Sequence, residues 1–79
     1  MPEFDLELDT CGLMCPLPLL RLKKILQTMQ NGQTVRVTAT DPASTLDFGV
    51  FLEQAGHSLL KIEHEQGVII FLVRKDGVV

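Results

Sequence analysis

With 79 residues, the chain can build one small core but not two ordinary domains, so we expect a single domain over residues 1–79. The hydrophobic fraction of 46% excludes a disordered chain, and the net charge of −3 argues against nucleic-acid binding, which needs clustered Lys and Arg. No apolar run approaches the roughly 20 residues that span a membrane, and the acidic start MPEFDLELD lacks a signal-peptide pattern, so we expect a cytoplasmic protein that does not enter membranes.

The first part of the chain predicts a strand followed by a helix. Apolar and acidic residues alternate over residues 4–9, which is typical of a strand with one buried face. Over residues 16–29, apolar side chains recur at the spacing of an amphipathic helix, at Leu19, Leu22, Leu26 and Met29. Asn31-Gly32 then supplies residues that tolerate the left-handed conformation at a helix end.

A second strand and a second helix are predicted next. Residues 33–40 alternate between apolar and polar side chains, as in a half-buried strand. Asp41 is interpreted as an N-cap and Pro42 as the first helical residue. This helix is expected to run to Ala55, where Gly56 stops it.

The end of the chain predicts a hairpin, with strands at residues 59–65 and 68–74 joined by Gln66-Gly67. The second of these strands is apolar from Val68 to Val73, which favours a central strand or one whose outer face meets a partner. The order is β-α-β-α-β-β. We therefore expect an α+β fold, a two-layer α/β sandwich with a four-stranded mixed sheet and both helices on one face.

The motif Cys15-Pro16-Leu17-Pro18 places a thiol at the expected start of the first helix. A residue before proline is kept out of the helical region, so Cys15 is predicted to be the N-cap. The positive end of the helix dipole would then lower the pKa of its thiol, although only moderately, because Pro18 has no N–H to donate. A small buried residue that happens to precede a helix is the other interpretation of Cys15.

Cys15 belongs to the longer stretch Leu8-Asp9-x-x-Gly12-Leu13-x-Cys15-Pro16-x-Pro18, and a second block reads Asp41-Pro42-Ala43-x-Thr45-x-Asp47. Over nearly the whole chain, these motifs resemble the TusA/SirA-like family, whose name-giving member is a sulfur carrier for tRNA 2-thiouridine synthesis. The resemblance implies that Cys15 accepts a sulfane sulfur as a persulfide and passes it to a partner protein. The protein would act as a sulfurtransferase-type carrier of low turnover, in tRNA thiolation, sulfur oxidation or cofactor sulfuration.

The same resemblance indicates the partners. A cysteine desulfurase or a rhodanese-like protein would donate the sulfur, and another protein would accept it. No bound cofactor is implied, and we expect a monomer or a weak homo-oligomer that does not bind nucleic acid stably. An RNA-binding or regulatory module remains a rival function, but the acidic charge and the lack of Trp and Tyr argue against it.

Other residues are expected to shape the loop that carries the thiol or to dock its partner proteins. Gly12, Pro16 and Pro18 would shape its loop and helix start, and Asp41 should lie near Cys15 because parallel strands end at one edge of a sheet. We interpret Asp41 as a cap rather than a catalytic residue. Three cations of the first helix would mostly face solvent, although they could dock an acidic partner: Arg21, Lys23 and Lys24.

Cys11 has two interpretations. It is either a small turn residue or a resolving thiol that forms a disulfide with Cys15. The second interpretation gives the alternative function, a thiol-disulfide redox module that uses Cys11 and Cys15.

The two histidines are not expected to serve the thiol. His57 should lie at the edge opposite Cys15, and His64 should end a strand that the family's sheet order puts on the far side. Both are expected at the surface or at strand ends. The spacing of the cysteines and histidines does not favour a metal site. Cys15 would therefore have no general base nearby, and its activation would come from the helix start.

Overall fold

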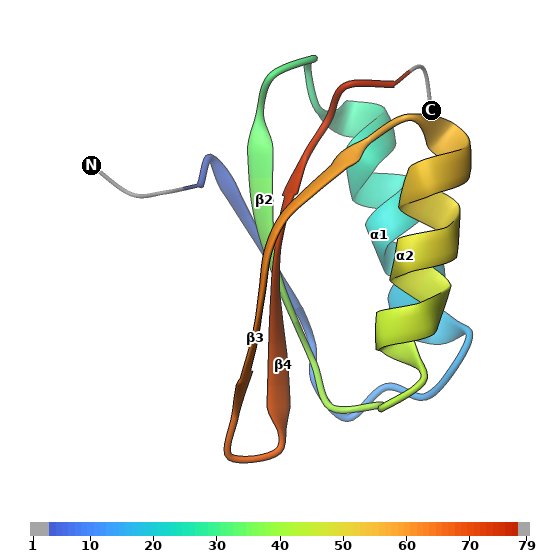
Figure 1. Cartoon of the computed structure of the whole chain (residues 1–79), viewed down its shortest axis with the longest axis vertical. Helices are drawn as coiled ribbons and strands as arrows, with labels where there is room; N and C mark the ends of the chain where they lie inside the picture. The colour runs from blue at the N-terminus through green and yellow to red at the C-terminus, as the bar shows by residue number, and fades with distance from the viewer. Residues whose placement is uncertain (1–3, 78–79) are drawn as a thin grey trace.

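The computed structural model describes residues 4–77 (Figure 1). These residues form four strands and two helices in the predicted order β-α-β-α-β-β. The elements are β1 (Leu6–Thr10), α1 (Leu17–Thr28), β2 (Thr34–Ala39), α2 (Ser44–Ala55), β3 (Ser58–Glu65) and β4 (Val68–Arg74).

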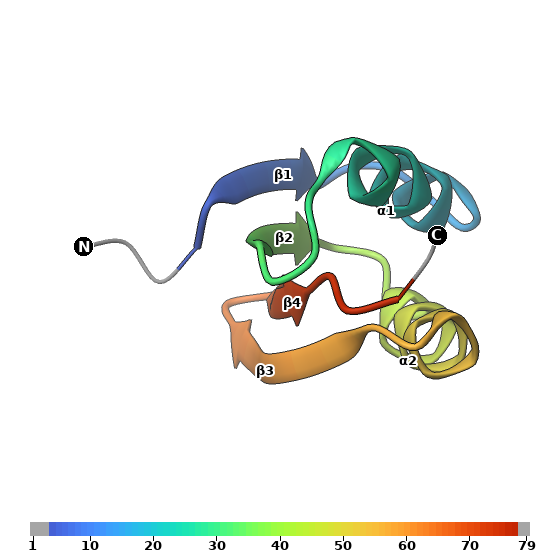
Figure 2. The ribbon, with the colours of Figure 1, turned by 90° about the horizontal axis from the view of Figure 1, so that it is seen from above.

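The four strands form one mixed sheet in the order β1-β2-β4-β3. β1 and β2 are parallel, whereas β4 is antiparallel to both β2 and β3. Seen from above, α1 and α2 lie on the same face of the sheet (Figure 2). The predicted α+β fold, a two-layer α/β sandwich with both helices on one face, is confirmed.

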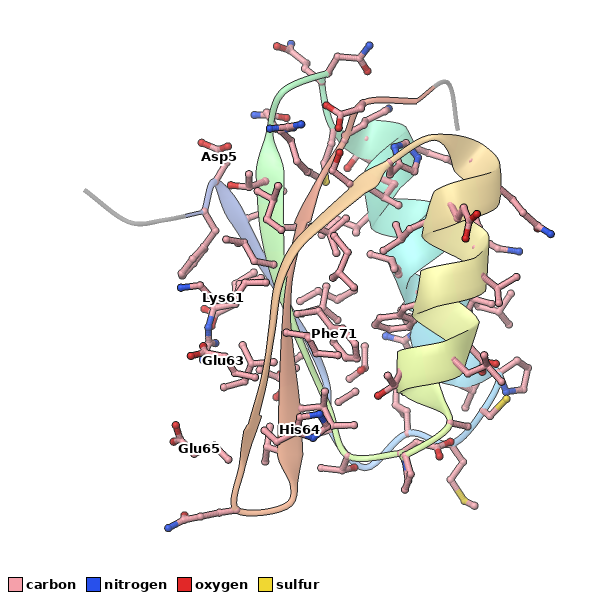
Figure 3. All side chains as sticks on the ribbon, in the orientation of Figure 1. Asp5, Lys61, Glu63, His64, Glu65 and Phe71 are labelled. Carbon is pink, nitrogen blue, oxygen red and sulfur yellow. The ribbon has the colours of Figure 1, made fainter. Side chains whose placement is uncertain are left out.

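The hydrophobic core lies between the helices and the inner face of the sheet. β2 and β4 contribute the centre of this face, and the Phe48 ring of α2 packs on the Phe71 ring of β4 with 4.6 Å between centroids. β4 is a central strand, as its apolar run predicted. Its outward side chains Val68, Ile70 and Leu72 are half-buried, because neighbouring strands flank them on both sides. Figure 3 shows Phe71 pointing toward the helices, and Lys61, Glu63 and Glu65 pointing away from them.

Both helices begin later than the sequence predicted. α1 starts at Leu17, and Pro16 holds the N-cap position without a side-chain hydrogen bond. α2 starts at Ser44 after an N-cap at Ala43, so Asp41-Pro42 does not begin the helix. The residues before each helix form turns instead, since the Leu17 N–H donates to Met14 O at 2.8 Å and the Ser44 N–H to Asp41 O at 3.0 Å.

The opposite end of the molecule is closed by two buried polar side chains. His57 is 7% exposed, and its Nδ1 accepts hydrogen bonds from the N–H groups of Asp76 and Gly77 at 3.2 and 3.0 Å. Lys75 is 8% exposed, and its Nζ donates to the Met29 carbonyl at the end of α1 at 2.8 Å. His57 lies at the expected end, after α2 and directly before β3. Of the two expected settings, the strand end is therefore correct and the surface is not, because the returning chain covers it.

Neither helix within residues 4–77 has the length and apolar character needed to cross a membrane.

Candidate functional site

Two loops meet where the C-terminal ends of the parallel strands β1 and β2 lie side by side. The two strands are parallel, so the loops that lead from them into α1 and α2 leave the sheet together (Figure 1). The Gly12 N–H donates to Thr40 Oγ1 at 2.9 Å, and the Cys15 N–H donates to Asp41 Oδ2 at 2.5 Å. The first loop is therefore fastened to the second, and the predicted proximity of Cys15 and Asp41 is confirmed.

The first loop begins with a tight turn at Gly12. Its φ is +83°, and the Leu13 N–H donates to Thr10 O across the turn at 3.1 Å. A side chain at this position would have open space but a strained backbone, so the conformation itself calls for glycine. Gly12 thus sets the direction in which the chain leaves β1 toward Cys15.

The Cys15 side chain is exposed, which contradicts the interpretation as a small buried residue. Its Sγ donates a hydrogen bond to Asp47 Oδ2 at 3.0 Å. Asp47 lies in the first turn of α2, where its own N–H donates to Ala43 O at 3.0 Å. The thiol of the first loop is thus directed at the carboxylate of the second helix.

Cys15 is not the N-cap of α1, contrary to the sequence-based prediction. One residue, Pro16, separates it from Leu17, the first residue of the helix, and this proline takes the cap position. Pro18 is buried in the first turn of α1, so it anchors the helix start to the core. The Cys15 side chain therefore does not cap α1, and its described hydrogen bond goes to Asp47 instead.

The pKa of the Cys15 thiol is raised rather than lowered. The main cause is the hydrogen bond that it donates to Asp47; desolvation and the negative charges of Asp47 and Asp41 act in the same direction. A neighbouring carboxylate favours the neutral thiol over the thiolate, because two like charges at this distance repel. The sequence-based prediction of a lowered pKa was therefore wrong.

Asp41 connects the two loops through its side chain. Its Oδ2 accepts from the Cys15 N–H, and its Oδ1 accepts from the Ala43 N–H at 3.0 Å. The second bond shapes the turn that leads into α2, which is the local effect expected of a cap, although the helix begins only at Ser44. Asp41 therefore positions the backbone of Cys15 and does not contact its sulfur in any bond described.

Cys11 is also an exposed, free cysteine. Its N–H donates to Asp9 Oδ1 at 2.9 Å, and a side-chain hydrogen bond to Asp9 raises the pKa of its thiol. Each thiol of this loop is thus paired with a carboxylate of its own, Cys11 with Asp9 and Cys15 with Asp47.

The three cations of α1 differ in their surroundings. Arg21 and Lys24 are exposed, whereas the Lys23 ammonium lies 5.1 Å from the centroid of the Phe51 ring of α2. Lys23 lines a groove of about 310 Å³ between the two helices, together with Leu19, Leu46, Asp47, Val50, Phe51 and Gln54. The prediction of a mostly solvated basic face therefore fits Arg21 and Lys24 but not Lys23.

Comparison with known proteins identifies the family. The sequence model described as "Sulfurtransferase TusA" matches residues 6–75. The protein named "Sulfur carrier protein TusA" from Allochromatium vinosum is 49% identical over 75 residues, which cover 95% of this chain and 99% of that relative. The chain belongs to the TusA family. The resemblance inferred from the Cys15 and Asp41 motifs is thus confirmed.

The TusA-family fold is confirmed by a solved structure. The crystal structure of a SirA-like protein from Desulfitobacterium hafniense matches this chain with a TM-score of 0.80 and 26% sequence identity. The match covers 91% of this chain and 99% of that one.

Asp47 is the site residue that sequence reasoning missed. The sequence placed it in the second family block but gave it no role, and Cys15 was expected to have no base nearby. A signal was nevertheless present, because a carboxylate in the first turn of the second helix faces the same edge of the sheet as the start of the first helix. In this TusA-family chain, the observed turns before both helices bring the two side chains within hydrogen-bond distance.

His64 is exposed and lies near the end of β3, as expected. It points to the helix side of β3 (Figure 3) and lines a hollow of about 250 Å³ with Thr40, Pro42, Thr45 and the β3–β4 turn. β3 is the edge strand opposite β1 in the sheet, so the expected far position of His64 in the strand order is confirmed. Within residues 4–77, the Cys, His, Asp and Glu side chains form no group that could hold a metal ion.

Proposed function

We propose that this chain is a sulfur carrier that accepts a sulfane sulfur as a persulfide on Cys15 and relays it to a partner protein. The observation that carries the proposal is the exposed thiol of Cys15 in a member of the TusA family. This thiol lies where the loop before α1 contacts the start of α2. The A. vinosum relative bears the name of a sulfur carrier, which supports this role. We place the carrier in the cytoplasm, as a single domain over residues 1–79 that is a monomer or a weak homo-oligomer.

The proposed transfer is an exchange of sulfur between thiols. The Cys15 sulfur attacks the outer sulfur of a donor persulfide, the S–S bond of the donor breaks, and the electron pair leaves on the donor sulfur, which takes up the proton lost by Cys15. A second, identical exchange passes the outer sulfur to an acceptor thiol. No net oxidation occurs, so the carrier needs no cofactor for either step. It is an enzyme in the sense of a sulfurtransferase-type relay, which returns to its starting state after each transfer.

The donor that we propose is a cysteine desulfurase or a rhodanese-like protein, and the acceptor is a further protein of tRNA thiolation, sulfur oxidation or cofactor sulfuration. Large apolar side chains near Cys15 are exposed, at Met14, Leu17, Leu20 and Leu46. Exposed apolar side chains beside a reactive group are typical of a protein-docking surface. Arg21 and Lys24 are exposed on α1, the helix that follows Cys15, and would steer an acidic partner surface toward the thiol.

Intact-mass spectrometry after incubation with a cysteine desulfurase and cysteine tests the transfer. We expect a gain of about 32 Da, one sulfur atom, in the wild type and in Cys11→Ala, and no gain in Cys15→Ala. A chain that gains no sulfur would contradict the proposal. Loss of two hydrogens without added sulfur, prevented in either cysteine variant, would instead support the redox module of Cys11 and Cys15.

The same assay tests the docking residues. At low salt, Arg21→Glu or Lys24→Glu should slow loading about two- to fivefold if these cations steer the donor. Lys61→Glu is the matched control, because Lys61 points away from the helices (Figure 3). Equal loading rates in all three variants would count against steering.

A further inference from the structure

The hydrogen bond between Cys15 and Asp47 joins residues 32 positions apart in the sequence. It is not needed to hold the loops together, because the backbone bonds of Gly12 and Cys15 already do so. The charged groups that act on the thiol lie in α2 and in the segment before it, Asp47 and Asp41, and both are negative. On its own side of the site, the first charged residue of α1 is Arg21, in the second turn. The sulfur is therefore held in a locally anionic setting although its reaction requires an anion.

We propose that Asp47 is a positioning residue that sets the protonation of Cys15: its carboxylate holds the empty carrier as a neutral thiol and disfavours the negatively charged persulfide of the loaded carrier. The second half of this proposal rests on the proposed function. The carrier would then be unreactive toward adventitious oxidants while empty, and would pass on its sulfur readily once loaded.

The physical reason lies in the two forms of the sulfur. The neutral thiol donates its proton to Asp47 Oδ2, as the 3.0 Å contact indicates, and this bond is lost when the thiol ionises. A persulfide is a stronger acid than a thiol and is largely ionised at neutral pH, so its outer sulfur carries negative charge next to the carboxylate. Like charges then raise the free energy of the loaded form relative to the empty one.

The exchange balances without an external oxidant or reductant. The loaded carrier, Cys15–S–S⁻, and an acceptor thiol give Cys15–SH and the acceptor persulfide anion. One sulfur atom moves to the acceptor, one proton moves to Cys15, and the bond to Asp47 forms again. Asp47 thus shifts the equilibrium of transfer toward the acceptor because it stabilises the empty product.

The first test measures Cys15 reactivity in a Cys11→Ala background, which leaves one described cysteine to titrate. At neutral pH, Asp47→Asn should raise the rate of alkylation by iodoacetamide roughly threefold or more, because a larger fraction of Cys15 is ionised. The midpoint of the pH–rate profile should move to lower pH. Asp47→Glu restores the charge and should return the rate toward that of the wild type.

Glu53→Gln is the matched control, since it removes one exposed carboxylate from α2 away from the thiol. Alkylation of Asp47→Asn at the rate of Glu53→Gln would overturn the proposal. A Glu variant as reactive as the Asn variant would also overturn it, because the charge would then not be the cause.

The second test measures the loaded form with glutathione persulfide and glutathione at a fixed ratio. The fraction of carrier that has gained one sulfur, read by intact mass, gives the equilibrium constant for loading. Asp47→Asn should increase this constant roughly threefold or more, as the like-charge repulsion is removed. An unchanged constant would overturn the claim about the loaded form. A wild type that takes up no sulfur would instead refute the proposed function, whereas the alkylation profile would still report on Asp47.

Discussion

Asp41 holds the two loops of the site together through hydrogen bonds of its side chain. Its carboxylate accepts two backbone N–H groups, from Cys15 in the first loop and from Ala43 in the second. Hydrogen bonds to a charged acceptor are among the stronger ones in proteins, and each here fixes backbone that no strand or helix holds. The place of the Cys15 sulfur therefore depends on a side chain that does not contact it.

Replacing this side chain should loosen the site and lower stability. We expect Asp41→Ala to reduce the free energy of unfolding by about 1–2 kcal/mol, less than two buried charged bonds would give, because the site is partly solvated. Urea unfolding followed by circular dichroism measures the change, since the chain has no Trp or Tyr for fluorescence. Asp41→Asn keeps one acceptor oxygen and should lose less. An Asp41→Ala midpoint equal to that of the wild type would contradict this role.

At the scale of the element, α2 joins the site to the core. Asp47 in its first turn contacts the thiol, while Phe48 and Leu52 on its buried face pack against the sheet. The helix contains a glycine, Gly49, whose backbone is helical. A Cβ added at this position would have no neighbouring atom within 4 Å. Glycine there contributes backbone freedom to the unfolded chain without a packing reason to keep it.

Gly49→Ala should therefore stabilise the protein by about 0.5–1 kcal/mol, because alanine costs less conformational entropy in a helix. The change appears as a higher urea midpoint or melting temperature. Gly12→Ala is the contrasting variant: its Cβ also meets open space, but the φ of +83° should make it destabilising by about 1 kcal/mol. If both variants shifted stability in the same direction, backbone conformation would not be the deciding factor.

Across the whole molecule, stability should depend on pH at both ends of the range. The folded state lowers the pKa of Asp9, chiefly through the backbone hydrogen bond from Cys11, and that of Asp76, chiefly through the hydrogen bond from Arg74. It raises the pKa of Cys15 and Cys11 through their carboxylate partners, Asp47 and Asp9.

The direction of each effect follows from proton linkage. The two carboxylates contribute stability above about pH 3.9, the pKa of an unfolded aspartate, and this is lost as pH falls through their lower folded values. The two thiols contribute stability below about pH 8.5, and this is lost as pH rises through their higher folded values.

Urea midpoints measured across pH should thus decline on both sides of a plateau. Asp9→Asn should weaken the acid decline and Cys11→Ala/Cys15→Ala the alkaline one. An alkaline decline that persists in the double variant would contradict the thiol contribution.

The sequence by itself determined the elements, the family and the candidate nucleophile of this protein. Alternation over residues 4–9 and 33–40 and helical spacing over residues 16–29 are local signals, so they can be read without a fold. The motif around Cys15 is also local. The mixed sheet with both helices on one face was predicted correctly because parallel strands joined by helices admit few arrangements.

Only the tertiary structure decided which groups surround the Cys15 thiol and in which direction they shift its pKa. Its N-cap role and its lowered pKa were predicted from its neighbours in the sequence, and both predictions were wrong. The bond to Asp47 spans 32 positions and depends on where two turns place the starts of two helices, which no local pattern encodes. Parallel pairing of β1 and β2 thus brings to the thiol the carboxylate that raises its pKa.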